Sequence, residues 1–416
     1  MFNSIKMNIL SLKERDRIRD RWLLERVNEL LPILMKKHKV ESWILVGREY
    51  NEDPVLETFF PSAIDSSSRL TILFVTMVKG HFEKYILNAN PNYSDYYELG
   101  WDFEEETQME ALKRLVEQKK PKNIGLNYGN LHAVTDGLTS SLYTQIMNIL
   151  GESYKDKVIS AEGLSIDWLQ IRTNSELNAY PHIAELARFI AKEALSNTVI
   201  HPGVTNTQEV VEWIRQRVVD LGLDTSFYPT VDIQREGEKR DRLEGVTILP
   251  GDVIHLDFGI RYLGLTTDTQ QLAYVLKQGE KKPPRGLNEG LKTALHLEEI
   301  IEEQFIAGCS GNDIFSGSME KAKELGIKAM IYSHPLGYHC HGAGPLIGLY
   351  DQQNEIQGRG ELPIEDNTCY AMEFNIRKFV PEWNQVVTFY LEEPVVFTSG
   401  QLYYLATRQK EFYLIK

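Results

Sequence analysis

Hydrophobic residues in the first 165 positions form short runs that are separated by amphipathic stretches. Apolar and β-branched runs bounded by turn residues indicate strands, and apolar positions on one face of a charged stretch indicate a helix. The expected strands are residues 42–47, 70–77, 83–88, 122–127 and 157–160, and the expected helices are residues 11–39, 105–119 and 135–150. Strands that alternate with helices in this way predict an α/β domain.

The pattern changes after a connecting segment at residues 164–180. Helical periodicity is followed by long runs with strong β-propensity. The expected helices are residues 174–198, 205–222, 286–306 and 312–325, and the expected strands include residues 369–380, 384–398 and 410–416. Thr205 and Gln208 have the spacing of a capping box at the start of the second helix. This half predicts an α+β arrangement in which helices cover an antiparallel sheet.

The segment from Pro250 to Leu276 is expected to form two strands around a glycine-bearing turn. Asp257 interrupts the apolar run of the first strand, and Asp268 interrupts the second. A buried carboxylate is costly unless it is paired or binds a cation, and two carboxylates on adjoining strands repel each other. The pattern therefore favours a site for a hard cation. The alternative is that Asp257 caps the turn and Asp268 faces water.

Composition narrows the possible functions. The chain has 416 residues, 42% hydrophobic and 25% charged, as in soluble globular proteins of two or three domains. A net charge of −14 argues against general nucleic-acid binding, which needs clustered Lys and Arg. The three cysteines are widely spaced and indicate a reduced compartment. The sequence shows neither a secretory signal nor a long apolar span, so we expect a cytoplasmic protein without membrane or nucleic-acid partners.

Further side chains that bind metals interrupt the C-terminal half. His334, His339 and His341 lie in the glycine-rich stretch SHPLGYHCHGAG, and Glu373 and Glu392 interrupt apolar strands. Each glutamate taken alone fits a structural role, and a lone histidine usually does too. Taken together, these side chains form a set of two aspartates, one histidine and two glutamates. Such a set suits a pair of divalent ions that share carboxylates. The imidazole favours Mn, Co, Fe or Zn over Ca or Mg.

These residues resemble a known family, the M24 metallopeptidases that include aminopeptidase P, prolidase and methionine aminopeptidase. Asp257 and Asp268 have the family's Asp-x10-Asp spacing, and His334 in SHPLG matches its ligand histidine. Glu373 and Glu392 match the two ligand glutamates. Two positions depart from the motifs, because Phe-Asn replaces the usual Pro-Gly after the first glutamate and tyrosine replaces the usual arginine before the second.

The resemblance implies a fold and an activity. The fold would be a "pita-bread" catalytic domain at residues 171–416, preceded by a creatinase-like N-terminal α/β domain at residues 1–170. The activity would be that of a dinuclear metal-dependent hydrolase, an Xaa-Pro-type aminopeptidase or dipeptidase that cleaves short peptides with a metal-bridging hydroxide. Two divalent ions are implied, with manganese favoured, and so is a homodimer.

The resemblance also implies a role for each site residue. The metal ligands would be Asp257, Asp268, His334, Glu373 and Glu392, with Asp257 and Glu392 as bridges. Glu373 would also shuttle a proton, and His341, seven residues after the ligand histidine, would stabilise the tetrahedral intermediate. His339 is a candidate substrate contact.

One departure concerns catalysis. Peptidases of this family carry a further histidine about 17 residues before the first aspartate, a position that corresponds to the region of Arg240 here. Arg240 is a candidate for binding a substrate carboxylate, or it belongs to a solvated loop. His255, in the same strand as Asp257, is not an obvious replacement. Two alternatives therefore stay open: a non-peptidase C–N hydrolase of the same fold, and a binding protein with altered catalysis.

Overall fold

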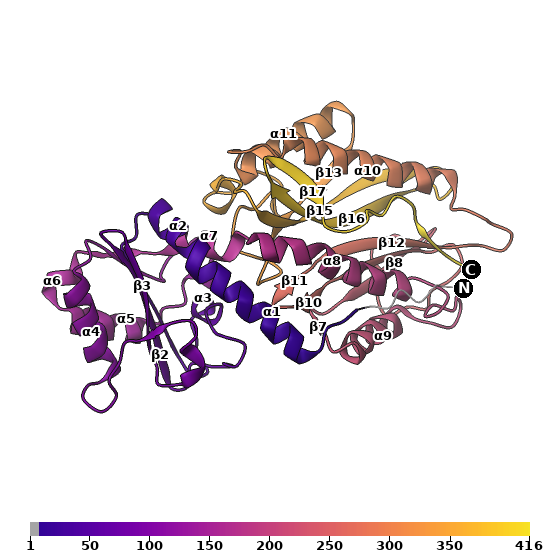
Figure 1. The fold of residues 1–416 in the computed structure, drawn as a ribbon. Coiled ribbons are helices and arrows are strands. Elements are labelled where there is room, and N and C mark those ends of the chain that lie inside the picture. Colours follow the sequence, from indigo (N-terminus) through magenta and orange to yellow (C-terminus); the bar gives the residue numbers. More distant parts are fainter. Residues whose placement is uncertain (1–7) are drawn as a thin grey trace. The chain divides into compact units, whose positions relative to one another are not determined.

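The computed structural model describes residues 8–416. The chain divides into two compact units, and the main boundary between them lies between Leu169 and Gln170 (Figure 1). Each unit has its own sheet and its own helices. The assignment of residues 1–170 as a creatinase-like domain and of residues 171–416 as the catalytic domain stays a prediction.

The first unit, Leu10–Leu169, is built on a mixed sheet with the strand order β4-β3-β2-β1-β5-β6. β1 pairs antiparallel with β2 and parallel with β5. The strands are β1 (Ser42–Arg48), β2 (Leu70–Val78), β3 (His81–Leu87), β4 (Glu98–Leu99), β5 (Ile124–Leu126) and β6 (Val158–Ser160). The helices are α1 (Leu12–Glu25), α2 (Leu31–Lys37), α3 (Pro54–Glu57), α4 (Gln108–Lys119), α5 (Ser140–Leu150), α6 (Glu152–Lys155) and α7 (Glu162–Gln170).

The long charged helix predicted at residues 11–39 is interrupted. A π-helical turn at Arg26–Leu30 separates α1 from α2. Arg26 is fully buried there, and its guanidinium lies over the Trp168 ring and donates a hydrogen bond to the Trp168 carbonyl. The predicted apolar face continues through the interruption, because Trp22, Leu23, Val27, Leu31 and Leu34 are all buried.

The second unit, Gln170–Lys416, contains a large sheet with the path β13-β15-β16-β12-β9-β8. Its strands are β8 (Thr230–Gln234), β9 (Val253–Phe258), β12 (Thr269–Val275), β13 (Lys328–Ile331), β14 (His334–Leu336), β15 (Thr368–Val380), β16 (Gln385–Thr398), β17 (Gln401–Tyr404) and β18 (Tyr413–Ile415). The helices of this unit are α8 (Asn174–Ala194), α9 (Thr207–Asp220), α10 (Arg285–Gln304) and α11 (Gly311–Glu324). The long central pairs are antiparallel, as the sequence predicts.

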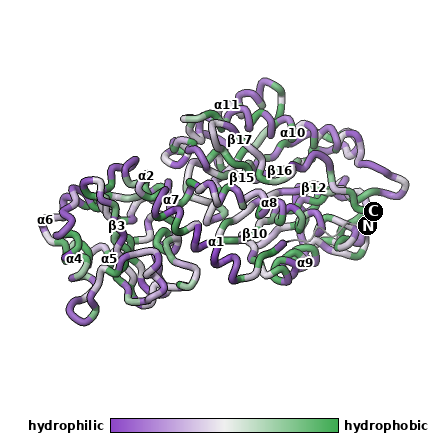
Figure 2. Tube along the Cα trace, viewed as in Figure 1, coloured by the Kyte–Doolittle hydropathy of each residue, from purple (hydrophilic) through white to green (hydrophobic). Residues whose placement is uncertain are grey.

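Two pairs of helices cover different parts of this sheet. α10 contacts β15 and β16, and α11 contacts β13, whereas α8 contacts β9 and β12, and α9 contacts β8. Figure 2 shows hydrophobic and hydrophilic residues alternating along α9 and α10, as expected for helices with one buried face. The loop between β12 and α10, residues 276–284, is hydrophilic over most of its length (Figure 2).

The chain makes an excursion between Asp257 and Asp268 that the sequence pattern does not reveal. After β9 it forms a second small hairpin, β10 (Ile260–Tyr262) and β11 (Leu265–Thr266), which pairs with β7 (Asp224–Thr225). Leu263 and Gly264 turn this hairpin with positive φ of 55° and 82°. The chain then returns as β12, which begins one residue after Asp268 and pairs with β9.

Gly259 makes this excursion possible. A Cβ atom at Gly259 would lie 1.9 Å from the Thr267 carbonyl oxygen, so only glycine allows the two chain segments to cross this closely. The backbone N–H of Ile260 donates to Thr267 Oγ1 at 3.0 Å and fixes the crossing. The crossing brings Asp257 and Asp268 to the same end of β9 and β12.

One predicted helix cap is wrong by a residue. The N-cap of α9 is Asn206, whose side chain accepts the Glu209 N–H, and Glu209 completes the capping box in place of the predicted Thr205 and Gln208. Thr205 instead accepts the His201 N–H. None of the helices in the described part of the chain combines the length and apolarity needed to cross a bilayer.

Candidate metal and catalytic site

The five predicted ligands come from five separate segments of the second unit. Asp257 lies in β9, Asp268 immediately precedes β12, His334 opens β14, Glu373 lies in β15 and Glu392 lies in β16. The sheet places them on one face, because directly paired residues of antiparallel strands project to the same side.

The register of the strands sets their order across the sheet. Glu373 pairs with Glu392, and Glu392 pairs with Gln270. Gln270 in turn pairs with Asp257. β14 lies on the other edge of β15, where Ser333 holds the Glu373 backbone through its hydroxyl at 2.9 and 3.0 Å. His334 follows this serine directly.

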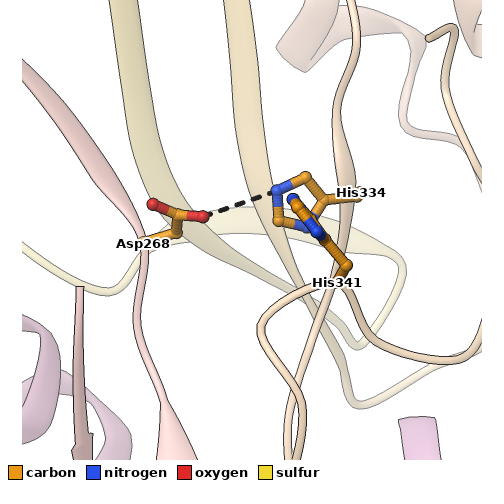
Figure 3. Close-up of side chains that lie close together, drawn as sticks. All are labelled: Asp268, His334 and His341. Atoms are coloured by element: carbon orange, nitrogen blue, oxygen red, sulfur yellow. Dashed lines mark ion pairs between the residues drawn. The ribbon is translucent and has the colours of Figure 1, made fainter. Parts of the chain in front are cut away.

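His334 Nε2 lies close to three of the four carboxylates. It is 3.6 Å from Asp268 Oδ2, 3.7 Å from Glu373 Oε2 and 3.8 Å from Glu392 Oε1. Atoms that bind one ion at about 2.1 Å stand about 3 to 4 Å from one another. Three groups of side chains have ligand atoms that all lie within 4.8 Å of one another. They are Asp257 with Asp268 and Glu392, His334 with Glu373 and Glu392, and Asp268 with His334 and His341 (Figure 3).

Several of these atoms are buried without a hydrogen-bond partner in residues 8–416. They are Asp257 Oδ1, Asp268 Oδ1, His334 Nε2 and both carboxylate oxygens of Glu392. Buried polar atoms in native proteins are otherwise almost always hydrogen-bonded, and an unsatisfied one costs about 1 to 3 kcal/mol. Divalent cations would satisfy these atoms, so the residues fit a metal centre.

The electrostatics agree with this fit. Burial raises the pKa of Asp257 well above its usual range, and the neighbouring Asp268 carboxylate raises it further. Burial and then Asp268 likewise raise the pKa of Glu373 and the pKa of Glu392. The carboxylates repel one another in a poorly solvated place, and positive charge between them would remove that repulsion.

His341 lies beside this cluster. Its ring meets the His334 ring edge-on with the centroids 4.4 Å apart, and Figure 3 shows both rings on the same side of Asp268. Burial and then the His334 ring lower the pKa of His341, and the charge of Arg359 acts in the same direction. His341 is therefore near enough to contact a molecule bound at the cluster.

Arg359 is a candidate that the sequence pattern does not reveal. Its side chain is half-buried, and burial lowers its pKa. Arg359 Nε has no hydrogen-bond partner within the described part of the chain, although Nη2 reaches the Gly342 carbonyl at 3.4 Å. A half-buried guanidinium with an unpaired donor, bonded to the residue after His341, is suited to bind a carboxylate. Its sequence context, QGRGEL, carries no signal for that role.

The two predicted substrate residues lie in different surroundings. His339 is half-buried, and burial and then the charge of Arg261 lower its pKa. Arg240 is exposed and pairs with Glu238 at 3.8 Å. It lines a cavity of about 180 Å³ that contains none of the five predicted ligands. Both substrate roles stay predictions.

Two other polar side chains contact the cluster directly. The Cys340 thiol donates to Asp268 Oδ2 at 3.0 Å, and burial raises the pKa of this thiol. The Gln270 side-chain amide donates to Glu373 Oε1. The sequence pattern gave no role to either residue.

Comparison with known proteins identifies the family. The profile of metallopeptidase family M24 matches residues 182–399, more than half of the chain. The chain therefore belongs to metallopeptidase family M24, and the predicted family and enzyme class are confirmed. A search of curated protein sequences gave no match.

Solved structures share the fold at low sequence identity. The X-Pro aminopeptidase from Thermotoga maritima MSB8 is 17% identical with a TM-score of 0.66, over 92% of this chain and 99% of that one. The Xaa-Pro dipeptidase from Bacillus anthracis is 17% identical with a TM-score of 0.63, over 94% and 99%. Aminopeptidase P from E. coli is 15% identical with a TM-score of 0.62, over 96% and 95%. The predicted α+β pita-bread fold is confirmed.

Proposed function

We propose that this metallopeptidase is a dinuclear enzyme that hydrolyses short peptides of the Xaa-Pro type. The convergence of five ligand-type side chains, four of which have unpartnered buried atoms, carries this proposal. Two of the three ligand groups share Glu392, which is the arrangement that two neighbouring ions with a common carboxylate would need. The mixed oxygen and imidazole donors suit Mn, Co, Fe or Zn, and Mn²⁺ is our first choice.

The surrounding residues have complementary roles. Divalent ions held by these ligands would polarise a peptide carbonyl and lower the pKa of a bound water molecule. Glu373 would accept a proton from that water and pass it to the leaving amine. His341 would donate a hydrogen bond to the oxygen that gains negative charge, and His339 would contact the substrate.

Arg359 favours a dipeptidase over an aminopeptidase. Its free donor near His341 would bind the C-terminal carboxylate of a two-residue substrate. An aminopeptidase that accepts longer peptides has no need for a residue that binds a carboxylate so close to the scissile bond. The choice between them is decided by comparing Xaa-Pro dipeptides with Xaa-Pro tripeptides and with C-terminally amidated Xaa-Pro.

The test is metal analysis followed by turnover. Purified protein is stripped with a chelator, reloaded with Mn²⁺ and assayed for bound metal and for release of proline. Two equivalents of metal and turnover of Xaa-Pro peptides are expected. Failure to bind a transition metal overturns the dinuclear site. Metal binding without any peptide turnover favours one of the alternatives, a non-peptidase C–N hydrolase or a binding protein.

The predicted homodimer and the predicted cytoplasmic location stay predictions. Light scattering of the purified protein gives the molecular mass in solution and checks the first. Cell fractionation checks the second. Neither result changes the proposed chemistry, which depends on residues of one chain.

A further inference from the structure

A row of hydrogen bonds crosses the sheet and ends on Glu373. Arg242 Nε donates to Asp232 Oδ2 at 2.8 Å, and His255 Nδ1 lies 2.9 Å from the same oxygen. His255 Nε2 lies 2.9 Å from Gln270 Oε1, and the Gln270 amide nitrogen donates to Glu373 Oε1. The row thus runs from the loop after β8, through β8, β9 and β12, to a predicted ligand in β15.

Strand register explains why these residues meet. Asp232 of β8 pairs directly with His255 of β9, and Gln270 is diagonal to His255 because it pairs with Asp257. Direct and diagonal neighbours on one face are within reach of long side chains. The three interior members of the row are almost completely buried, with 0% of Asp232, 2% of His255 and 2% of Gln270 exposed.

Aromatic packing restrains His255, the central residue of the row. The His255 ring packs against the Tyr390 ring with the centroids 4.5 Å apart, and the Arg242 guanidinium lies 5.9 Å from the same ring. The Tyr390 ring on one face, together with a partner at each ring nitrogen, leaves the His255 ring little freedom to rotate. His255 therefore presents its two nitrogens to Asp232 and Gln270 in a fixed direction.

The two carboxylate oxygens of Glu373 have different partners. Gln270 occupies Oε1, so Oε2 is the oxygen that faces His334 Nε2 at 3.7 Å. As a metal ligand Glu373 is ionised and only accepts hydrogen bonds, which places the amide nitrogen of Gln270 toward Glu373 and its oxygen toward His255. The orientation of Gln270 is thus fixed from both ends.

We propose that Gln270, held by His255 and Asp232, is a positioning residue that presents Glu373 Oε2 to the metal centre. This inference rests on the proposed function, since it assigns Glu373 as a ligand. Hydrogen bonds to the outer oxygen of a ligating carboxylate fix its orientation, and losing such a partner typically lowers metal affinity about 10- to 100-fold. In this chain the row of hydrogen bonds that positions Glu373 begins at Arg242, whose side chain is partly exposed at the surface.

The first test compares two adjacent glutamines. Gln270→Met keeps the side-chain volume and removes the amide. Gln271→Met is the matched control, because Gln271 is equally buried and lies on the opposite face of β12, where it bonds Thr269 and Tyr413. Mn²⁺ affinity is measured by isothermal titration calorimetry on the full chain. We expect a loss of about 10- to 100-fold for Gln270→Met and a change within about twofold for the control.

The second test separates this inference from the proposed function. Crystal structures of metal-free wild-type protein and metal-free Gln270→Met show the Glu373 carboxylate without any ion. The inference expects Glu373 to turn away from His334 in the variant only. An unchanged Glu373 overturns the inference. A wild-type protein that binds no divalent ion contradicts the proposed function, and the position of Glu373 in the two metal-free structures still decides the inference.

Variants of His255 test the rest of the row. His255→Phe keeps a ring against Tyr390 but removes both nitrogens, whereas His255→Gln restores a donor toward Gln270. We expect Mn²⁺ affinity to fall about tenfold in His255→Phe and to recover in His255→Gln. Equal Mn²⁺ affinity for wild type, His255→Phe and His255→Gln would show that His255 only fills space, and would remove it from the row.

Discussion

Glu373 and Glu392 are directly paired residues of β15 and β16, and their carboxylates project from the same face of the sheet. Burial raises the pKa of both groups, and the nearby Asp268 carboxylate raises it further. Two buried acids side by side oppose folding of the metal-free chain, and the same arrangement provides the binding energy for a cation. Stability and metal binding are therefore expected to respond in opposite directions to one substitution.

Glu392→Gln should stabilise the metal-free protein and abolish metal binding. Removing the buried charge relieves repulsion, and we expect the free energy of unfolding to rise by about 1 to 2 kcal/mol in the presence of a chelator. Differential scanning calorimetry with and without Mn²⁺ measures both effects. Glu393→Gln is the control, because Glu393 contacts Arg188 and the Gln409 N–H and should leave metal binding intact. A metal-free Glu392→Gln protein less stable than wild type would contradict the prediction.

Arg359→Met should raise the KM for Xaa-Pro dipeptides about 10- to 100-fold, since one charge-assisted hydrogen bond contributes about 1.5 to 3 kcal/mol. Its effect on C-terminally amidated substrates should be small, because those lack the carboxylate. Steady-state kinetics on both substrates measures the difference. Arg240→Met serves as the comparison and tests the substrate role predicted for Arg240 from the sequence. A larger effect in Arg240→Met than in Arg359→Met would reverse the assignment.

His341→Asn should lower kcat about 100-fold or more while metal affinity changes little, because its proposed hydrogen bond forms mainly in the transition state. Mn²⁺ titration and kcat on the same preparation separate the two quantities. His339→Asn is the neighbouring control, with a smaller effect expected. If His341→Asn instead loses metal in proportion to activity, His341 is a ligand and not a hydrogen-bond donor to the substrate.

Glu298 should make stability depend on pH. Burial raises the pKa of Glu298 to about 7, although the nearby Arg408 opposes the shift. The folded protein therefore binds this proton more tightly than the unfolded chain, so the contribution to stability is complete below about pH 4.5 and is lost as the pH rises toward 7. Between pH 4.5 and 7.5, wild type should lose about 2 to 3 kcal/mol relative to Glu298→Gln.

Urea unfolding of wild type and Glu298→Gln across this pH range measures the loss. The difference between the two proteins isolates Glu298 from the other titrating groups. A constant difference across the range would show that Glu298 ionises normally in the folded state.

Gly259→Ala should destabilise the second unit, because the new Cβ would overlap the Thr267 carbonyl. We expect a loss of about 2 kcal/mol or more, with weaker Mn²⁺ binding because the crossing positions Asp257 and Asp268. Gly317→Ala is the control. Gly317 lies in α11, and its nearest neighbour is the end of the flexible Gln304 side chain. Equal stability of the two variants would contradict the account of the crossing.

The sequence predicts site residues best where a residue type is unusual for its surroundings and has few structural explanations. Acidic residues inside apolar runs are rare, so Asp257, Glu373 and Glu392 were recognisable, and their spacing resembled a known family. The α+β class followed from the long apolar strands of the second half. The family profile that confirms the predicted family spans residues 182–399, which include these positions.

Other features depend on contacts that no local pattern encodes. Thr205 and Asn206 both have side chains that cap helices, so the pattern could not choose between them. Gln270 and His255 acquire their contacts from the pairing of β9 with β12, and glutamine in a strand has no specific meaning by itself. Arg359 is distinguished only by what surrounds it after folding.

The five predicted ligand positions extend from residue 257 to residue 392, so the site is complete only after residue 392 has been synthesised. Asp257 and Asp268 leave the ribosome more than a hundred residues before Glu392 does, and the central strand β16 must then insert between β12 and β15. A nascent or truncated chain that ends before β16 lacks the shared carboxylate. The complete metal site is therefore expected to form only after β16 has joined the sheet, so a fully metal-loaded molecule is one whose sheet is complete.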